Sequence, residues 1–213
     1  MIIPKLHYIS QGNSSKEHLE NIQKACSSGS ELVQLRLKNI SVKEYLAFAS
    51  EAREITAHFQ TRLIINDYYK IAKEVKADGV HLEKTATCPT IAREHLYTWQ
   101  MIGGTANTLQ DCETLISKEV DYISLGPFKL SETKENLPTF LGLNGYTAII
   151  DVLKTETPII GVGGITTEDV TDILKTGISG VAVSEEITQD FNNISIFHQL
   201  LNASSTQEQR YTF

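Results

Sequence analysis

The chain lacks several features that mark common classes of protein. No run approaches the roughly 18 consecutive apolar residues of a membrane-spanning helix, and the start, MIIPKLHYIS, lacks the basic and then apolar segments of a secretion signal. Its three cysteines, Cys26, Cys88 and Cys112, form no CxxC pair, which argues against a zinc or dithiol site. We therefore expect a soluble cytoplasmic protein with no membrane partner.

Positive charge is also scarce. The net charge of −7 argues against non-specific binding to nucleic acid, although a few local cations could still hold a small anion. At 213 residues and 41% apolar content, the chain is long enough to bury a large core, as one α/β barrel or as two small domains.

Eight short apolar runs recur along the chain and are predicted strands. Several of them, such as LIIN and PIIGV, are apolar without alternation, which is typical of parallel strands covered by helices on both faces. The runs are LHYIS (6–10), LVQLR (32–36), RLIIN (62–66), GVHL (79–82), WQMIG (99–103), DYISLG (121–126), PIIGVG (158–163) and GVAVS (180–184).

The segments between these runs are predicted helices. Residues 42–59 place apolar side chains, Val42 and Ala49 among them, at spacings of three and four, with charges on the other side. Ser41, just before this segment, and Glu44 have the spacing of a capping box, which predicts where the helix begins.

Eight strand and helix units at this length predict one closed (β/α)₈ barrel, a TIM barrel, over residues 1–202. A doubly wound open sheet is the alternative, but SQGNSSKEH follows the first predicted strand, where that fold usually carries G-x-G-x-x-G. Residues 203–213 are predicted to form a polar tail that frays or docks on a neighbour, so a homodimer is left open.

Polar side chains gather at the ends of the predicted strands, and in such barrels the carboxyl ends of the strands build the active site. Each also has a structural interpretation: the cations could lie in a surface loop, the Asn-Asp pair could cap a helix, and the histidine could be a core residue. Their convergence on one rim favours a site. They are Gln34, Arg36 and Lys38 at strand two, Asn66 and Asp67 at strand three, His81 at strand four and Thr105 at strand five.

Glycines suggest a phosphate site on the same rim. Gly163 and Gly164 lie between the seventh predicted strand and a helix whose start is marked by Thr166 or Thr167. Without side chains they let backbone N–H groups approach a phosphate, and the helix dipole favours its charge. The segment around Ser184 has the same position after the eighth strand, although these turns could also be purely structural.

A loop after the sixth predicted strand carries Ser131, Thr133 and Lys134 within four residues. It is either a solvated loop or a set of donors for an anion. Lys134 would join the cations of strand two beside the carboxylate of Asp67, an arrangement that suits pyrophosphate with Mg²⁺. Two phosphorylated small molecules, joined in one pocket, are therefore the hypothesis.

Motifs along most of the chain resemble the thiamine phosphate synthase family in their order, spacing and strand positions. The resemblance implies a (β/α)₈ barrel that couples hydroxymethylpyrimidine pyrophosphate to hydroxyethylthiazole phosphate and releases pyrophosphate in thiamine biosynthesis. The family shares its superfamily with a thiazole tautomerase branch. The motifs are VQLRLKN (33–39), LIINDYYKIAKEVKADGVHL (63–82), IGGTANT (102–108), LGPFKLSETK (125–134), GLNGY (142–146), IIGVGGIT (159–166) and GVAVS (180–184).

The resemblance also implies a role for each matching residue. Catalysis would be electrostatic, because Mg²⁺ and nearby cations stabilise the charge that grows on the departing pyrophosphate. Pyrophosphate would be held by Arg36, Lys38 and Lys134, Mg²⁺ by Asp67, the pyrimidine by Gln34, Asn66 and Thr105, and the thiazole phosphate by Ser131, Thr133 and backbone groups around Gly164 and Ser184.

Two positions depart from the family pattern. The family has LGQED or LGKND after GVH, with the aspartate as a second Mg²⁺ ligand, whereas this chain reads LEKTATCP and carries Ala86 there. Glu83, three residues earlier, could reach inward. Glu185 stands where related sequences have a small residue, and its charge would weaken phosphate binding unless it points away.

These departures keep two alternatives open beside a synthase with an altered Mg²⁺ site. The first is a tautomerase-like isomerase, although that branch has a histidine where this chain has Pro127, so His81 would have to supply the chemistry. The second is a barrel that binds thiamine-related phosphates without converting them.

Overall fold

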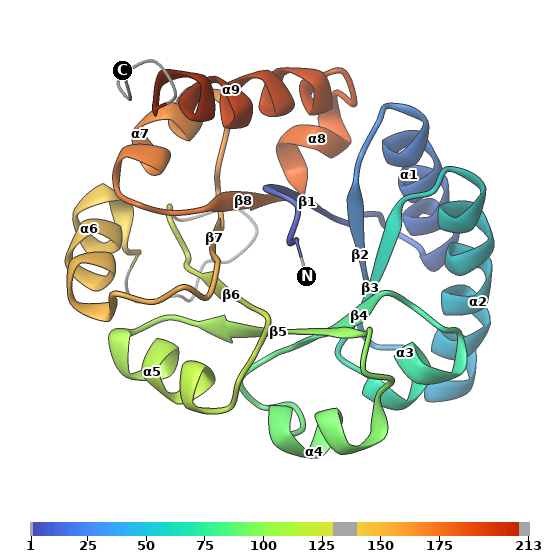
Figure 1. The fold of residues 1–213 in the computed structure, drawn as a ribbon. Helices are drawn as coiled ribbons and strands as arrows, with labels where there is room; N and C mark the ends of the chain where they lie inside the picture. Colours follow the sequence, from blue (N-terminus) through green and yellow to red (C-terminus); the bar gives the residue numbers. More distant parts are fainter. Residues whose placement is uncertain (1, 130–139, 209–213) are drawn as a thin grey trace.

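The computed structural model describes residues 2–129 and 140–208, with side chains up to residue 203. Eight parallel strands follow one another around a closed barrel, and β8 pairs with β1 (Figure 1). The predicted barrel is confirmed, and the open sheet is excluded. The strands are β1 (Leu6–Ile9), β2 (Leu32–Arg36), β3 (Arg62–Asn66), β4 (Gly79–Leu82), β5 (Met101–Ala106), β6 (Tyr122–Leu125), β7 (Ile159–Val162) and β8 (Gly180–Val183).

Helices surround the strands on the outside of the barrel (Figure 1). The predicted boundary of the polar tail at residue 203 falls within the last of them, α9. The helices are α1 (Ser15–Ser27), α2 (Val42–His58), α3 (Tyr69–Glu74), α4 (Pro89–His95), α5 (Leu109–Ser117), α6 (Gly142–Leu153), the 3₁₀ turn η1 (Thr167–Asp169), α7 (Val170–Lys175), α8 (Glu185–Gln189) and α9 (Asn193–Glu208).

Helix α2 begins with the predicted capping box. The Ser41 hydroxyl accepts a hydrogen bond from the Glu44 N–H at 3.2 Å, and the Glu44 carboxylate accepts one from the Ser41 N–H at 3.0 Å. Tyr45 and Ala49 lie on the buried face, whereas Val42 is 58% exposed. The prediction that Val42 belongs to the apolar face was wrong, because the stripe that meets the barrel starts one turn later, at Tyr45.

Strand β5 begins later than predicted. Its first residue is Met101, and it runs to Ala106, whereas Trp99 is 47% exposed. The side chain of Gln100 is buried and donates to the carbonyl oxygens of Ala72 at 2.9 Å and Ala77 at 2.8 Å. Gln100 therefore satisfies backbone carbonyl groups at the end of α3 and does not belong to the strand. The apolar pattern of the sequence does not reveal this contact.

Two apolar cores follow from the alternation of side chains along each strand. One fills the space between strands and helices, and the other fills the barrel itself. Since residues two apart in a strand share a face, Gln34 and Arg36 continue the inward face that starts with Leu32, and Asn66 continues that of Ile64. The barrel interior is formed by Leu32, Ile64, Met101, Tyr122, Ile160 and Ala182.

Gly103 makes room for the largest of these interior side chains. A Cβ at this position would lie 2.1 Å from Cζ of the Tyr122 ring, which is fully buried. A residue with any side chain would therefore displace the ring. The glycine thus determines how the middle of the barrel is filled.

Two buried histidines make the fold sensitive to acid. Burial lowers the pKa of His7 to about 3 and that of His81 to about 4. The Nε2 atom of His7 lies 3.0 Å from the Pro4 carbonyl oxygen, while its buried Nδ1 has no hydrogen-bond partner among the described residues. A proton on His7 would therefore bring a poorly compensated charge into the barrel, whereas for His81 the nearby charge of Glu83 favours protonation but does not outweigh burial.

We expect acid to destabilise the fold through these histidines. In the unfolded chain they bind protons below about pH 6.5, but in the folded chain only near pH 3 to 4, so stability is lost progressively as pH falls between these limits. The loss should approach about 1.4 kcal/mol per pH unit for each histidine. Urea unfolding at pH 7.5, 6.0 and 5.0 measures it. His7→Gln should flatten the slope, whereas His58→Gln, at an exposed position, should not. Equal slopes in wild type and His7→Gln would contradict this account.

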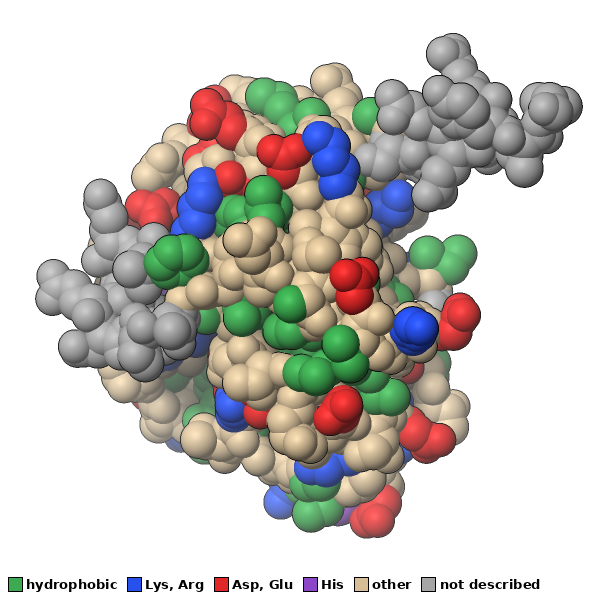
Figure 2. Space-filling model, turned by 90° about the vertical axis from the view of Figure 1, so that its left-hand side faces the viewer, with side chains coloured by type: hydrophobic (Ala, Val, Ile, Leu, Met, Phe, Trp, Pro, Cys, Tyr) green, Lys and Arg blue, Asp and Glu red, His purple; other side chains and the backbone are tan. Residues whose placement is uncertain are grey.

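Within the described residues, no helix is long and apolar enough to cross a membrane. Figure 2 shows the face that carries α6 and α7, where acidic, basic and apolar side chains are mixed. Lysine and arginine do not gather into a continuous patch on the coloured part of that face.

Candidate active site

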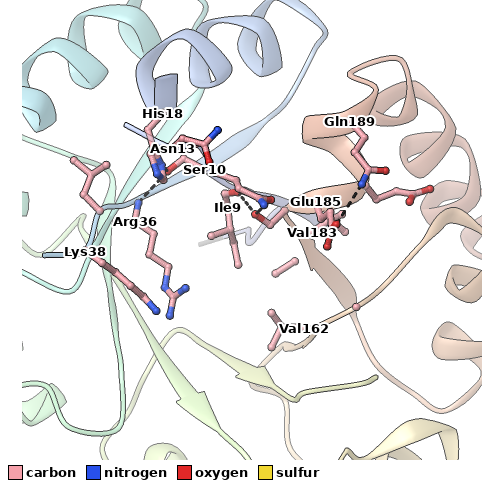
Figure 3. Close-up of a pocket in the computed structure, with 18 of the residues that line it drawn as sticks. Ile9, Ser10, Asn13, His18, Arg36, Lys38, Val162, Val183, Glu185 and Gln189 are labelled. Atoms are coloured by element: carbon pink, nitrogen blue, oxygen red, sulfur yellow. Dashed lines mark hydrogen bonds between the residues drawn. The ribbon is translucent and has the colours of Figure 1, made fainter. Parts of the chain in front are cut away.

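A cavity of about 910 Å³ opens at the carboxyl ends of the strands. Its walls come from β1, β2, β7, β8 and the segments that follow them. Figure 3 shows the side chains of Arg36 and Lys38 lying side by side in it, across from the segment that carries Glu185. The volume suits one or two small substrates. Among the predicted residues, Arg36, Lys38, Gly163, Gly164 and Ser184 line this cavity.

Arg36 connects this cavity to a polar network next to it. Its guanidinium lies against the carboxylate of Glu83, with Nη2 3.2 Å and Nε 3.3 Å from Oε1. Its backbone N–H donates to the Ser10 hydroxyl at 3.1 Å. The Arg36 side chain is only 27% exposed, so it is held at the rim and is not the surface cation of the structural interpretation.

Glu83 lies at the centre of this network. Besides pairing with Arg36, it accepts hydrogen bonds from the Asn66 amide at 3.2 Å and from the Thr105 hydroxyl at 3.2 Å. Asn66 also donates to the side-chain oxygen of Gln34 at 3.1 Å. The predicted residues of β2, β3 and β5 are thus brought together by a carboxylate to which the sequence assigned no definite role.

Asp67 follows Asn66 and is partly buried. Burial, together with the negative charge of Glu83, raises the pKa of Asp67, although the Arg36 charge opposes this. Burial also acts to raise the pKa of Glu83, but the groups around that carboxylate outweigh burial and lower its pKa. The Asp67 carboxylate therefore experiences both the negative charge of Glu83 and the positive charge of Arg36.

His81 is a core residue, as its structural interpretation held. It is 4% exposed, and its ring nitrogens lie 2.9 Å from the Thr105 hydroxyl and 3.2 Å from the Tyr122 hydroxyl. In contrast, the structural interpretation of Asn66 and Asp67 as helix caps was wrong. The N-cap of α3 is Tyr68, with no side-chain cap hydrogen bond.

Gly163 and Gly164 form the turn after β7 and line the cavity. Their φ angles are +101° and +65°, in the left-handed region that favours glycine. The predicted helix start is a capping box of Thr166 and Asp169 that opens the short turn η1 before α7. The backbone can thus approach a ligand closely at this point.

Ser184 and Glu185 follow β8 and line the same cavity as the Gly163 turn. The Ser184 hydroxyl lies 2.9 Å from the Ile9 carbonyl oxygen and 3.1 Å from the Gln11 side-chain oxygen, so its proton is directed to the protein. Glu185 lines the cavity, and its carboxylate accepts a hydrogen bond from Gln189 at 3.2 Å. Backbone groups are therefore the better phosphate donors here.

Three predicted residues, Ser131, Thr133 and Lys134, lie outside the described part of the chain. The residues on either side of segment 130–139 are held together. Leu141 and Gly142 donate backbone hydrogen bonds to the carbonyl oxygens of Pro127 at 2.9 Å and Phe128 at 3.0 Å. These described flanking residues lie beside the Gly163 turn, because the Lys129 N–H donates to the Gly163 carbonyl oxygen at 3.0 Å.

Sequence reasoning missed Ser10 and His18, which both line the cavity. The Ser10 hydroxyl lies 2.8 Å from Nδ1 of His18, as Figure 3 shows. The signal for Ser10 was available, since it is the polar residue that ends the first predicted strand. His18 lies inside α1, where nothing in the pattern distinguishes it from a surface residue.

The donors near Asp67 suit a hard divalent cation. No group of three or more His, Cys, Asp and Glu side chains that could hold a metal occurs among the described residues. Mg²⁺ in phosphate-handling sites, however, is commonly bound by one or two carboxylates together with phosphate oxygens and water. Asp67 and Glu83 provide two carboxylates beside each other, so this donor set fits that manner of binding.

Comparison with known proteins gives consistent results. The family model described as thiamine monophosphate synthase matches residues 6–187. A thiamine-phosphate synthase from Flavobacterium johnsoniae is 39% identical over 199 residues, covering 92% of this chain and 94% of the relative. One from Flavobacterium psychrophilum is 41% identical, covering 92% and 97%. A solved structure of thiamine phosphate pyrophosphorylase from Pyrococcus furiosus has a TM-score of 0.79 at 24% identity, covering 92% of this chain and 96% of that one, and shows the likeness in fold.

Proposed function

Because the chain belongs to the thiamine monophosphate synthase family, we propose that it is a thiamine phosphate synthase, a transferase of a pyrimidinylmethyl group. It couples hydroxymethylpyrimidine pyrophosphate to hydroxyethylthiazole phosphate and releases pyrophosphate. The relatives that carry this name match more than nine-tenths of the chain and of their own length. A cytoplasmic location and a homodimer stay predictions.

One structural observation supports this function most strongly. A single cavity is lined both by the cations Arg36 and Lys38 and by the turn of Gly163 and Gly164. A site for two phosphorylated substrates needs two anion-binding regions close enough for the reacting atoms to meet. Arg36 and Lys38 serve the pyrophosphate, together with Lys134, and the glycine turn serves the thiazole phosphate, together with Ser131, Thr133 and backbone groups at Ser184.

The proposed reaction exchanges one bond for another at the pyrimidine methylene carbon. The bond to the pyrophosphate oxygen breaks and its electron pair leaves with pyrophosphate, while the thiazole nitrogen supplies the pair for the new C–N bond. Arg36 and Lys38 stabilise the charge that develops on the departing oxygens. Gln34, Asn66 and Thr105 orient the pyrimidine, and exclusion of water protects the cationic carbon.

Mg²⁺ dependence is part of the proposal. Asp67 would hold the ion, which when bound supplies positive charge next to the pyrophosphate oxygens. The protein supplies no nucleophile in this scheme. His81, the one candidate for the isomerase alternative, is buried and its ring nitrogens face Thr105 and Tyr122, and relatives named as synthases do not favour that alternative.

A coupling assay tests the function directly. Purified protein is mixed with both substrates over a Mg²⁺ titration, and thiamine phosphate and pyrophosphate are measured. Equal amounts of the two products, formed only with the divalent ion, are expected. Measurable binding of either substrate with no product at any Mg²⁺ concentration would contradict the proposal and favour a binding barrel.

Glu185 should weaken the affinity for the thiazole phosphate. Glu185 lines the same cavity as Gly164, and two like charges about 6 Å apart in water repel by roughly 0.7 kcal/mol. Glu185→Gln is therefore expected to lower KM for the thiazole phosphate by about two- to fivefold, most clearly at low salt. Steady-state kinetics at two salt concentrations measure this. Glu156→Gln, at an exposed position on the loop before β7, is the control, and an unchanged KM in Glu185→Gln would contradict the prediction.

A further inference from the structure

The turn after β4 has lost one carboxylate and carries another. Position 86, which would supply an acidic ligand in related sequences, is Ala86, and its backbone N–H donates to the Glu83 carbonyl oxygen at 2.9 Å. Glu83 therefore begins the same turn, directly after β4. An acidic side chain is present in this turn, three residues earlier than the resemblance requires.

The side chain of Glu83 is directed into the site. Its Oε1 atom receives hydrogen bonds from Arg36 and Asn66, and its Oε2 atom lies 3.2 Å from the Thr105 hydroxyl. The Glu83 side chain is only 31% exposed. Removing a carboxylate charge from water costs free energy. A glutamate with no role in the site would therefore be more stable with its side chain in solvent.

Arg36 does not use the full capacity of this carboxylate. An ionised carboxylate has about four lone-pair positions on its two oxygens. The guanidinium and the Asn66 amide both approach Oε1, whereas Thr105 is the one described partner of Oε2. The second oxygen thus keeps room for another positively charged partner.

Asp67 lies where it can share that partner. Strands β3 and β4 are neighbours, and Asn66 pairs with His81. Asp67 is one residue after Asn66, and Glu83 is two residues after His81. Both residues therefore follow the ends of adjacent strands. Asn66, which precedes Asp67, touches Glu83 through its amide. The Asp67 carboxylate is close enough to Glu83 for the Glu83 charge to raise its pKa, so both belong to the same part of the rim.

We propose that Glu83 is the second acidic ligand of the divalent cation in this chain, in place of the carboxylate that position 86 lacks. The cation is held between Asp67 and Glu83, and Arg36 is then available to the pyrophosphate. This inference rests on the proposed function for the identity of the ion. It concerns a position where this chain departs from the pattern of the resemblance, which has glycine where Glu83 stands.

Binding of Mn²⁺ without substrates tests the inference. Mn²⁺ accepts the same oxygen ligands as Mg²⁺, and its paramagnetic resonance signal distinguishes free from bound ion. Glu83→Gln keeps the size of the side chain and removes its charge, and it should weaken Mn²⁺ binding at least tenfold. Ala86→Asp added to Glu83→Gln should restore most of the affinity, because it returns a carboxylate to the same turn.

Controls separate ligation from a general effect on charge or folding. Glu94→Gln, at an exposed position in α4, removes one negative charge and should leave Mn²⁺ affinity unchanged. Thermal unfolding should show that Glu83→Gln is folded. Equal Mn²⁺ affinity in wild type and Glu83→Gln, including no measurable binding in both, would overturn the inference.

The outcome is independent of the coupling assay. Mn²⁺ binding through Glu83 in a protein that forms no thiamine phosphate would refute the proposed function and leave the ligand assignment standing. Conversely, an active synthase whose Mn²⁺ affinity does not depend on Glu83 would leave the function intact. Glu83 would then be only a counter-ion that positions Arg36.

Discussion

Replacing Arg36 by alanine should lower kcat/KM for the pyrophosphate substrate at least 100-fold, which corresponds to about 2.7 kcal/mol. Two effects add. The variant loses a guanidinium that lines the cavity, and it removes the arginine partner of Glu83, so the divalent cation alone then offsets this half-buried negative charge beside the incoming pyrophosphate. Steady-state kinetics with the pyrophosphate substrate varied and the thiazole phosphate saturating measure the loss.

The two effects can be separated. If the unpaired Glu83 contributes, Arg36→Ala combined with Glu83→Gln should be less impaired in its KM for the pyrophosphate substrate than Arg36→Ala alone, when Mg²⁺ is saturating. Arg53 is a matched control, since it has similar exposure and pairs with Asp78 at 2.6 Å on the side of α2. Arg53→Ala should reduce stability and leave the kinetic constants of the folded protein unchanged. Wild-type kinetics in Arg36→Ala would exclude a role in binding the leaving group.

This pair illustrates how far the sequence could predict the site. Arg36 could be placed on the rim because it ends an apolar strand in register with Leu32 and Gln34, and alternation along a strand is a local property. The partner of Arg36 could not be predicted in the same way. Glu83 comes from a turn 47 positions along the chain, and its inward orientation depends on donors from two other strands, Asn66 of β3 and Thr105 of β5.

The fold was more predictable than the site for a related reason. Apolar runs bounded by turns reflect burial on both faces, so three of the eight predicted strands have the observed bounds and four differ by one residue at one or both ends. The fifth was displaced because the side chain of Gln100 satisfies carbonyl groups at the end of α3, a long-range contact without a local pattern. Val42 was misplaced because its helix turns its buried face toward the barrel only from Tyr45 onward.

The glycine turn after β7 was predictable because it depends on backbone conformation and not on long-range side-chain contacts. Gly163 and Gly164 both have positive φ angles, which glycine adopts readily because it has no side chain. The residue type alone therefore indicates the turn. For Ser184 the sequence likewise predicted a role for backbone groups. Its hydroxyl is directed to Ile9 and Gln11, so the backbone is what it can offer a phosphate.

Gly163→Ala should raise KM for the thiazole phosphate at least 30-fold, about 2 kcal/mol, and change KM for the pyrophosphate substrate less than threefold. At φ +101° a side chain is strained, and its Cβ would lie 2.8 Å from Cβ of Pro127. The turn must shift to relieve this contact, which moves the backbone groups that approach the phosphate. Kinetics with each substrate varied in turn measure both constants.

Gly29 provides the control that separates backbone strain from damage to the site. Its φ is +91°, and a Cβ there would meet nothing within 4 Å. It follows α1 at the end of the barrel opposite the cavity. Gly29→Ala should therefore lower the melting temperature through its backbone alone and leave both KM values as in wild type. If Gly163→Ala behaves like Gly29→Ala, the glycine turn stabilises the fold but does not hold the phosphate. A selective rise in KM would assign the phosphate to the β7 side of the cavity and, by exclusion, the pyrophosphate to Arg36 and Lys38.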